Sequence, residues 1–358
     1  PTQRILLNAL DEKSVRAALD NLRDNHEFVG LRNSALARQR ADWIIGMNLT
    51  RMYTIRSQAA GYTGTISVGR VQTPTTALVV RRELAIRTFK PQAYYVLHVD
   101  FSHANGIIPT VWEPENQGEE RRILKRSTAE QVLGEVQHSQ GTVELVEQKK
   151  GQQQQKLPYS LSALQIDAGK IFGYSPQEVL DTQQSLYEKK LTTYPRSDCD
   201  YLPTNQLADV PIILRNLQGV SAELSQIVEH ADPALQSRAW NDKKISAHHA
   251  IIPTTITPSW DDLSEREQNL YLLVAKAYLA QFYPPQTFFS TIIRIRCAGE
   301  SFKASGKVIS DDGWKKLYHG TLEEKDNEEQ SESKLPGVTR GEPVSYHESQ
   351  IKQQTTKP

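Results

Sequence analysis

The first ninety residues carry apolar positions at helical spacing. Between Ala37 and Met52, apolar residues return every three or four positions, which predicts a long helix starting near Ser34. A shorter amphipathic helix is expected over residues 11–25, where DEKSVRAALDNLRDN opens with an aspartate. In TPTTALVVRRELAIRTF, Thr73 is the expected N-cap and Pro74 the first helical residue. This part of the chain is therefore predicted to be helical.

The pattern changes to strand-like alternation after residue 92. YYVLHVDFSH, IIPTVWEP and GTVELVEQKK alternate or run apolar in the manner of strands, so a β region is predicted from Ala93 to Lys150. The polar stretch GQQQQK that follows is the expected linker into a new unit.

Helices resume beyond this linker. One is predicted over residues 160–172, and Ser175 with Glu178 forms a capping box for another that ends near Lys190. A second capping box, Ser264 with Glu267, opens the strongly amphipathic EREQNLYLLVAKAYLAQF. Residues 153–282 are therefore predicted to form a helical unit.

Strand-like sequence returns near the C-terminal end. TFFSTIIRIRCAG and SFKASGKVI predict two strands, LPGVTRGEPVSYHES a turn and an edge strand, and QIKQQTTKP an unstructured tail. The acidic stretch LEEKDNEEQSESK (residues 322–334) is expected to be a solvated loop. The order helical, β, helical, β suggests one β domain interrupted by a helical domain. The expected units are 1–88, then 89–152 together with 283–350, and 153–282 as the insertion.

Length and composition fit a globular protein of two or three domains. The chain has 358 residues, 38% of them hydrophobic and 23% charged. It contains no apolar run long enough for a membrane span and no signal peptide, so a cytoplasmic protein is expected. The start at proline suggests a fragment or a processed chain. Cys199 and Cys297 have no metal-binding spacing and are expected to be free thiols.

The charge is balanced overall but uneven along the chain. There are 42 basic and 42 acidic residues, yet the acidic stretch holds a concentrated excess, which leaves the remainder net basic. The predicted long helix is rich in arginine and has Asp42 as its one acid between Ala37 and Arg56. Such a local basic surface is suited to phosphate contact despite the zero net charge.

LTTYPRSDCDYLP contains the first candidate for chemistry. Tyr194 needs help to act as a nucleophile, because a phenol has a pKa of about 10. Arg196 can stabilise a phenolate and bind phosphate, and Pro195 favours an extended backbone in which residues two apart project to the same face. The alternative is a tyrosine packed at a turn with a surface arginine.

Two further stretches carry polar groups suited to phosphate chemistry. In DKKISAHHAIIPT, His248 or His249 can relay a proton or contact a phosphate, although either can also be a structural core histidine. No third ligand at a suitable spacing makes this pair a zinc site. In SVGRVQTP, Gly69 permits close approach and Arg70 can reach a phosphate just before a helix start, or the stretch is an ordinary glycine turn.

Taken in order, these stretches resemble the type IA DNA topoisomerases. SVGRVQTP, LPYSLSALQIDAGKIFGYSPQEVLDTQQSLYEKKLTTYPRSD and AHHAIIPT follow one another as in that family, and ALARQRADWIIGMNLTRMYT is similar to its preceding helix. The resemblance covers nearly the whole chain and is greatest to the bacterial topoisomerase III branch. It implies an α+β multidomain fold, the torus core of type IA enzymes, in which helical domains accompany an interrupted β domain that acts as a hinge.

The resemblance also implies roles for individual residues. Tyr194 would form a 5′-phosphotyrosine with one DNA strand, Arg196 would hold the scissile phosphate, and His248 would serve as the active-site histidine. The cleavage, strand passage and religation of single-stranded DNA would need no ATP. The residues expected to contact DNA are Arg38, Asp42, Ser67, Arg70, Gln72, Thr193, Lys244 and His249.

The family's magnesium site has no counterpart in this sequence. The resemblance implies that Mg²⁺ is bound by carboxylates of an N-terminal Toprim domain, and this sequence is expected to be a fragment without that domain and without the C-terminal end. Asp198 and Asp200 fit the D-x-D pattern, but they follow the tyrosine rather than an apolar strand, so no metal site is expected here. The expected partner is single-stranded DNA, bound by a monomer with no membrane association.

Other tyrosine-dependent DNA enzymes fit less well. Tyrosine recombinases and type IB enzymes resemble one another in having His-x-x-Arg well before a late tyrosine, whereas HHAI follows Tyr194 and has no arginine. Type II enzymes place arginine directly before the tyrosine, where this chain has Thr193. A clamp that binds single-stranded DNA without cleaving it remains the alternative.

Overall fold

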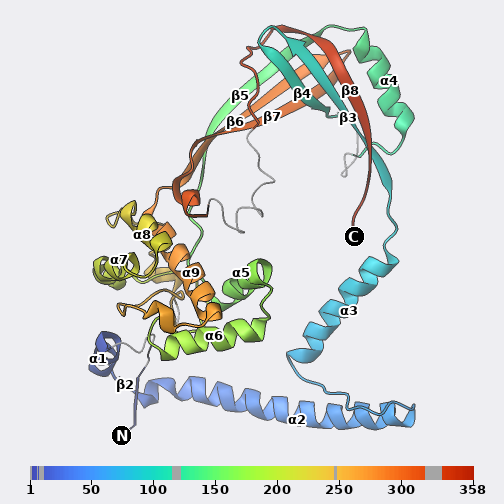
Figure 1. Cartoon of the computed structure of the whole chain (residues 1–358). Coiled ribbons are helices and arrows are strands. Elements are labelled where there is room, and N and C mark those ends of the chain that lie inside the picture. The colour runs from blue at the N-terminus through green and yellow to red at the C-terminus, as the bar shows by residue number, and fades with distance from the viewer. Residues whose placement is uncertain (1, 6, 8–11, 115–121, 246–247, 319–332) are drawn as a thin grey trace.

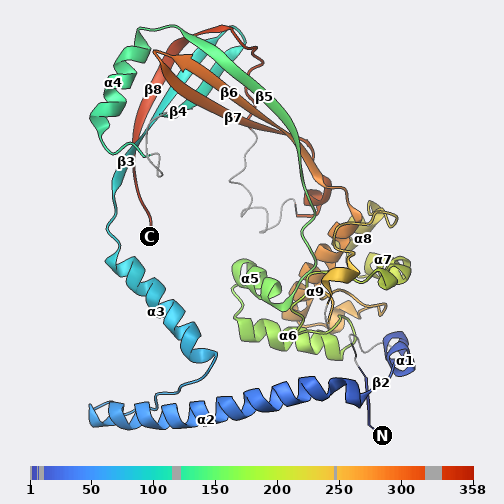
Figure 2. The same cartoon turned by 180° about the vertical axis from the view of Figure 1, so that it is seen from behind.

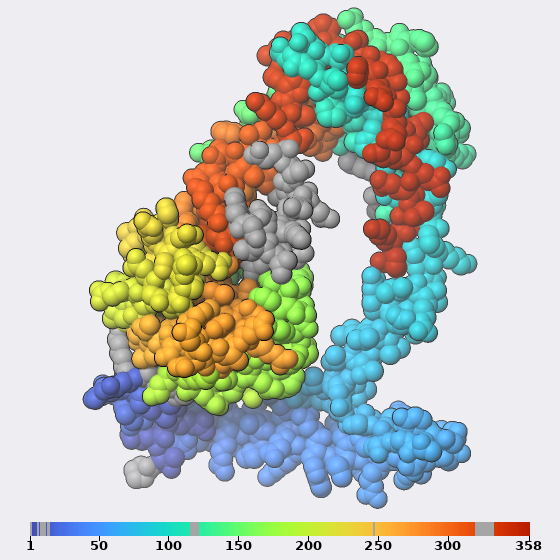
Figure 3. All heavy atoms as spheres, viewed as in Figure 1, coloured from blue at the N-terminus to red at the C-terminus, as the bar shows by residue number. Residues whose placement is uncertain are grey.

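The chain forms an open ring in this computed structural model, which describes residues 2–5, 7, 12–114, 122–245, 248–318 and 333–358. A β barrel lies at one end, a compact helical unit on one side, and two long helices complete the circuit (Figures 1 and 2). The space-filling view in Figure 3 shows an opening between the helical unit and the two helices. The structure is therefore α+β, with the ring that the resemblance implies.

Two long helices without a buried core form one side of the ring. They are α2 (Val29–Ala59) and α3 (Gln72–Thr88), preceded by β1 (Gln3–Arg4), α1 (Glu12–Asp20), β2 (Arg23–Asp24) and the 3-10 helix η1 (Asn25–Phe28). Neither α2 nor α3 buries a side chain among the described residues. No helix in the described part of the chain is both long and apolar enough to cross a membrane.

Three details of this region differ from the sequence prediction. Helix α1 ends at Asp20 because the next residues pair as β2 with β1, and α2 begins at Val29, before Ser34. The predicted N-cap at Thr73 is wrong, since α3 already begins at Gln72. Instead of capping the helix, the Thr73 hydroxyl accepts the backbone N–H of Gly69 at 3.0 Å. This bond tightens the glycine turn before α3.

The β segments on both sides of the helical insertion share one barrel. Its strands are β3 (Ala93–His103), β4 (Gly106–Trp112), β5 (Gly141–Gln153), β6 (Gln286–Cys297), β7 (Glu300–Asp311) and β8 (Pro343–Thr355). They close antiparallel in the order β3-β4-β7-β6-β5-β8. The predicted sharing of a sheet across the insertion is confirmed by the long β5–β6 and β3–β8 pairings.

Four predictions for the β region are wrong. Helix α4 (Arg126–Gln137) interrupts it, because Ala129, Val132 and Val136 recur at helical spacing and are buried against the barrel core. Strand β5 continues through the first residues of the expected linker, and β8 through most of the expected unstructured tail. Strand β8 is not an edge, since it pairs with both β3 and β5. The predicted acidic loop lies outside the described residues except for its last two positions.

The helical unit is built around one nearly buried helix. It contains α5 (Leu161–Phe172), α6 (Pro176–Glu188), α7 (Val210–Gln218), α8 (Ala222–Glu229) and α9 (Glu265–Leu279), with short 3-10 helices η2 (Thr204–Asp209), η3 (Asp242–Lys244), η4 (Trp260–Asp262), η5 (Ala280–Phe282) and η6 (Gly313–Tyr318). Both predicted capping boxes are confirmed, at the starts of α6 and α9. Helix α9 is the centre of the core, where Leu270, Val274 and Tyr278 are fully buried.

Candidate active site

The segment that carries Tyr194 is fixed on one side by the stretch that follows the two histidines. The Thr193 N–H donates to the Ile252 carbonyl at 3.0 Å, and the Thr254 N–H donates to the Leu191 carbonyl at 3.0 Å. These bonds join the residues after α6 to residues more than fifty positions later. Because the neighbouring peptides are held, the Tyr194 backbone has little freedom.

The same segment is fixed on its other side by the start of α5. The Leu161 N–H donates to the Ser197 carbonyl at 2.8 Å, and the Ser160 N–H donates to the Asp200 carboxylate at 2.9 Å. Asp200 therefore anchors the N-terminus of α5, where a carboxylate is favoured by the helix dipole. Its position explains why an acid follows the tyrosine without invoking a metal.

The Tyr194 ring is half-buried and held between two other rings. It stacks on the His248 imidazole with centroids 4.2 Å apart and 21° between the planes. Tyr187, from the last turn of α6, meets it edge-on at 5.9 Å. The sequence prediction paired Tyr194 with Arg196 and did not include Tyr187, although Tyr187 lies on the apolar face of a predicted helix. The phenol is thus fixed in orientation beside an imidazole.

Arg196 lies on the open side of this segment. Its side chain is exposed, whereas its neighbours Pro195 and Ser197 are buried, so exposure alternates as the same-face prediction requires. The backbone at Pro195 and Arg196 is a turn, however, and not the extended chain assumed from the sequence. Arg196 makes no ion pair with any residue that the structure describes, which leaves its guanidinium available to an anion.

Two residues predicted to contact DNA are instead inside the helical unit. Thr193 is 3% exposed, and its hydroxyl donates to the Ala250 carbonyl and accepts the Ile252 N–H, each at 3.0 Å. His249 is 4% exposed, with Nδ1 2.8 Å from the Ala250 carbonyl oxygen. Burial lowers the pKa of His249 and so favours its neutral form. Both side chains support the backbone around Tyr194.

Lys244 lies near the histidines at the surface. Its ammonium donates to the Tyr201 hydroxyl at 2.8 Å and lies 4.5 Å from the centre of that ring. The predicted DNA contact by Lys244 is compatible with this exposed position, since an ammonium has three donors and this bond uses one.

The predicted groove residues lie on the first half of α2 and in the loop that leads into α3. Arg70 forms an ion pair with Asp42, with Nε at 2.9 and 3.1 Å from the two carboxylate oxygens. Gln72 donates to the Ser67 hydroxyl at 2.7 Å. Arg38 is exposed on α2. The pairing of Asp42 with Arg70 differs from the base contact expected for Asp42 from the sequence.

The loop before α3 is pinned along α2. The Thr50 hydroxyl accepts the Val68 N–H at 2.9 Å, and the Thr54 hydroxyl accepts the Ile66 N–H at 3.0 Å. A shallow hollow of about 570 Å³ opens beside this loop and is lined by Gly69, Val71, Gln72, Thr75 and Thr76. The exposed N-terminal turn of α3 lines this hollow, as a phosphate-binding surface would require.

The described residues contain no group of three or more histidine, cysteine or acidic side chains placed to hold a metal ion. Asp200 is bonded to the Ser160 backbone, as described above, and Asp198 is exposed beside it. The described residues therefore do not fit a Mg²⁺ site, which the resemblance places in the Toprim domain instead.

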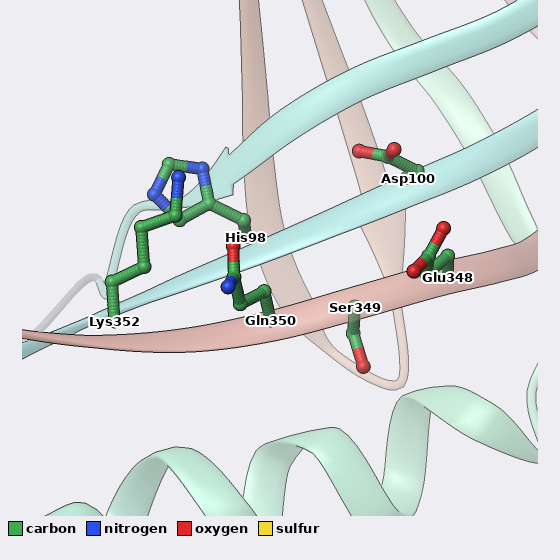
Figure 4. A pocket seen from close by; sticks show the side chains of 6 residues that line it. All are labelled: His98, Asp100, Glu348, Ser349, Gln350 and Lys352. Carbon is green, nitrogen blue, oxygen red and sulfur yellow. The ribbon is translucent and has the colours of Figure 1, made fainter.

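A polar cavity on the barrel lies outside this arrangement. It has a volume of about 440 Å³, and Figure 4 shows the side chains that line it from β3 and β8. They are His98, Asp100, Glu348, Ser349, Gln350 and Lys352. None of them belongs to the predicted site, and Figure 1 places these strands at the opposite end of the ring from α6.

Comparisons with known proteins agree with the sequence resemblance. A sequence model described as DNA topoisomerase matches residues 27–358. The chain is 43% identical over 366 residues to DNA topoisomerase 3 of Vibrio cholerae, covering 99% of this chain and 56% of that protein. It is 39% identical over 364 residues to DNA topoisomerase 3 of Salmonella typhimurium, covering 99% of this chain and 55% of that protein. The chain thus spans little more than half the length of these relatives.

A solved structure shares the fold. Full-length topoisomerase I from Thermotoga maritima superposes with a TM-score of 0.70 at 22% identity, covering 99% of this chain and 55% of that one. The family match and the relatives that are about 40% identical show that this chain belongs to the DNA topoisomerases, within the type IA class and similar to its bacterial topoisomerase III branch.

Proposed function

We propose that this chain carries the strand-cleaving centre of a topoisomerase that acts on single-stranded DNA without ATP. The observation that carries the proposal is the stack of Tyr194 on His248, at 4.2 Å, with the exposed Arg196 two residues away. A phenol, an imidazole and a guanidinium can supply the nucleophile, the proton carrier and the phosphate ligand for attack on a phosphodiester.

The proposed reaction exchanges one phosphodiester for another. The Tyr194 hydroxyl oxygen attacks the scissile phosphorus, and the bond from phosphorus to the 3′ oxygen breaks. The phenol loses its proton and the departing 3′ oxygen gains one, which leaves a 5′-phosphotyrosine and a free 3′ hydroxyl. Because no phosphodiester is lost, attack by the same 3′ hydroxyl reseals the strand without an external energy source.

Arg196 and His248 have distinct roles in this proposal. The Arg196 guanidinium binds the non-bridging phosphate oxygens and offsets the charge that develops on them during attack. The His248 imidazole, stacked on the nucleophile, exchanges a proton or contacts the phosphate when it is charged.

The proposed path of the strand leads from the tyrosine along the loop before α3. Arg38 and Arg70 offer positive charge there, and Ser67 with Gln72 offers hydrogen bonds beside the exposed start of α3. Lys244 would contact the strand from the helical unit. We propose no Mg²⁺ ligand in this chain.

Covalent trapping tests the cleavage directly. The chain is mixed with an end-labelled single-stranded oligonucleotide and Mg²⁺, with and without the parts of the Vibrio cholerae relative that the match leaves uncovered, and then denatured. A labelled protein band is expected, and Tyr194→Phe should abolish it. Tyr174→Phe is the matched control, because Tyr174 stacks on Phe172 away from the site and should leave the band unchanged.

Two outcomes would contradict the proposal. If an adduct persists in Tyr194→Phe, another residue is the nucleophile. If the supplemented chain binds the oligonucleotide yet gives no adduct, the chain is a single-strand clamp and not a cleaving centre.

A further inference from the structure

His249, the residue after the stacked His248, is buried with both ring nitrogens engaged by the protein. Its Nδ1 is 2.8 Å from the Ala250 carbonyl oxygen, and its Nε2 is 3.0 Å from the side-chain amide nitrogen of Gln206, which lies within η2. A carbonyl oxygen only accepts hydrogen bonds, so Nδ1 must carry a proton. The ring of His249 is therefore neutral if Nε2 is bare and positively charged if Nε2 also carries a proton.

Only two arrangements satisfy Nε2. If Nε2 is bare, it accepts from the Gln206 amide, as the structure has it, and the buried Gln206 Oε1 is left without a hydrogen-bond partner among the described residues. If Nε2 is protonated, the amide must turn to present Oε1, and the ring carries a buried positive charge. Burial and the neighbouring His248 both lower the pKa of His249, which favours the first arrangement.

The Ala250 carbonyl connects this histidine to the tyrosine. The same oxygen accepts both His249 Nδ1 and the Thr193 hydroxyl, and Thr193 directly precedes Tyr194. On the other side, His249 is the chain neighbour of His248, whose ring stacks on Tyr194. His249 thus holds both partners of the stack through the backbone.

We propose that Gln206 and His249 are positioning residues, with His249 held as the neutral Nδ1–H tautomer so that Tyr194 and His248 stay stacked. The hydrogen bonds behind this inference do not depend on the proposed function. The purpose of the arrangement, to hold a nucleophile in place, does rest on it. A neutral His249 also spares the site a buried positive charge next to His248.

The tautomer can be measured in the chain by itself. Nitrogen-15 spectra of histidine-labelled protein, assigned with His249→Asn, should show a protonated Nδ1 and a bare Nε2 for His249 at pH 7. In Gln206→Glu, the carboxylate accepts from Nε2, so His249 should become doubly protonated at neutral pH. A His249 that is already doubly protonated at pH 7 in the unmodified chain, or that carries its proton on Nε2, would overturn the inference.

Paired substitutions test the positioning role. Asparagine at 249 can place an amide N–H where Nδ1 lies and keep the bond to the Ala250 carbonyl, whereas glutamine extends past that place. His249→Asn should keep the ring-current shifts that Tyr194 imposes on His248, and cleavage within about threefold. His249→Gln should lose those shifts and slow cleavage about 10- to 100-fold at unchanged affinity for single-stranded DNA, as misplacement of a reacting group does.

These readouts separate the two proposals. Equal loss of the ring-current shifts in both variants, or no loss in either, would refute the positioning role whether or not the chain cleaves DNA. If the shifts behave as expected but no covalent adduct forms with unmodified protein, the positioning role stands and the cleavage proposal fails.

Discussion

At the scale of single residues, Arg196 is distinguished by having no carboxylate partner among the described residues. It is exposed, forms no ion pair with a described residue, and follows the stacked Tyr194 by two positions. An arginine that only stabilised the fold would be expected to have a protein partner, such as the carboxylate that holds Arg70. We therefore expect Arg196 to stabilise the transition state of cleavage and not the folded structure.

Arg196→Ala should slow cleavage much more than it weakens binding. Removing a group that stabilises developing charge costs about 10²- to 10³-fold in rate, whereas losing one of several phosphate contacts changes affinity only slightly. Single-turnover adduct formation and oligonucleotide binding, measured on the same preparation, check this. Arg196→Lys keeps the charge and should retain part of the rate. Equal losses in rate and affinity would assign Arg196 to binding alone.

The ion pair between Asp42 and Arg70 leads to a second prediction. Because Asp42 holds Arg70 through Nε, both terminal nitrogens of the guanidinium stay available to a phosphate. Asp42→Asn should therefore raise the affinity for single-stranded DNA and steepen its salt dependence by roughly 0.7 per added charge. Salt titrations of oligonucleotide binding measure this slope.

Glu130→Gln is the matched control, since it breaks the similar exposed pair with Arg126 on the barrel helix α4. That change should leave the slope unaltered. If Asp42 instead accepts a hydrogen bond from a base, as expected from the sequence, Asp42→Asn would lower affinity for oligonucleotides containing that base and spare the others.

At the scale of elements, helices and strands could be predicted where a short stretch of sequence carries a clear motif. The capping boxes at Ser175 and Ser264 were predicted because a capping box is written in four adjacent residues. Helix α4 was missed because its few apolar positions lie among strands that dominate the pattern. The sequence prediction ends strand β8 too early. The polar end of this strand is held by pairing with β3, which lies about 250 residues earlier, so the local sequence carries no sign of it.

The candidate site could likewise be predicted only where short motifs mark its residues. Tyr194, Arg196 and His248 were found from short motifs and the family resemblance. The burial of Thr193 and His249 was not predicted, because their partners Ala250 and Gln206 are brought near only by the fold. Gln206 has no local signal at all.

The helix before the tyrosine is tied to α9 by one carboxylate. Glu267 accepts from Lys189 at 2.7 Å and from Ser185 at 2.8 Å, both on α6 or its C-cap, and from the Ser264 N–H at 2.9 Å. Burial raises the pKa of Glu267, but these hydrogen bonds outweigh it and lower the pKa to about 2. A single side chain thus joins the end of α6 to the start of α9.

Because the folded pKa of Glu267 is depressed, the stability it contributes is present above its unfolded value of about 4.5 and is lost as pH falls toward 2. Glu267→Gln should lower the free energy of unfolding by about 2 kcal/mol at pH 7, with the difference from unmodified protein shrinking below pH 4. Denaturant titrations across this range measure it. Glu265→Gln, an exposed acid in the same turn, should have little effect at any pH. A difference that persists undiminished at pH 2 would contradict the linkage.

At the scale of the whole molecule, the helical unit and the barrel meet at a joint around Trp314. The Trp314 N–H donates to the Pro284 carbonyl at 2.9 Å, and its indole N–H donates to the Gln153 carbonyl at 3.1 Å. Three passes of the chain converge there, near the boundaries proposed from sequence at 152 and 282. We propose that the helical unit, predicted as residues 153–282 and joined in the structure by η6, moves as a gate about this joint, relative to the barrel and to residues 1–88.

If the gate must open for strand passage, locking it should separate passage from cleavage. Helix α2 passes α6 in projection in both views of the ring (Figures 1 and 2), so a cysteine introduced on each can be joined by a flexible bifunctional reagent chosen to span the distance between them. The native Cys199 and Cys297 are free but buried, and should react far more slowly than exposed thiols.

The locked protein, supplemented as in the trapping experiment, should form the covalent adduct at the normal rate yet fail to relax or unlink DNA. Each single-cysteine variant treated with the same reagent should keep both activities. Relaxation that continues in the locked protein would show that the ring passes DNA without this gate, and loss of the adduct as well would mean that the movement is needed to admit the strand to Tyr194.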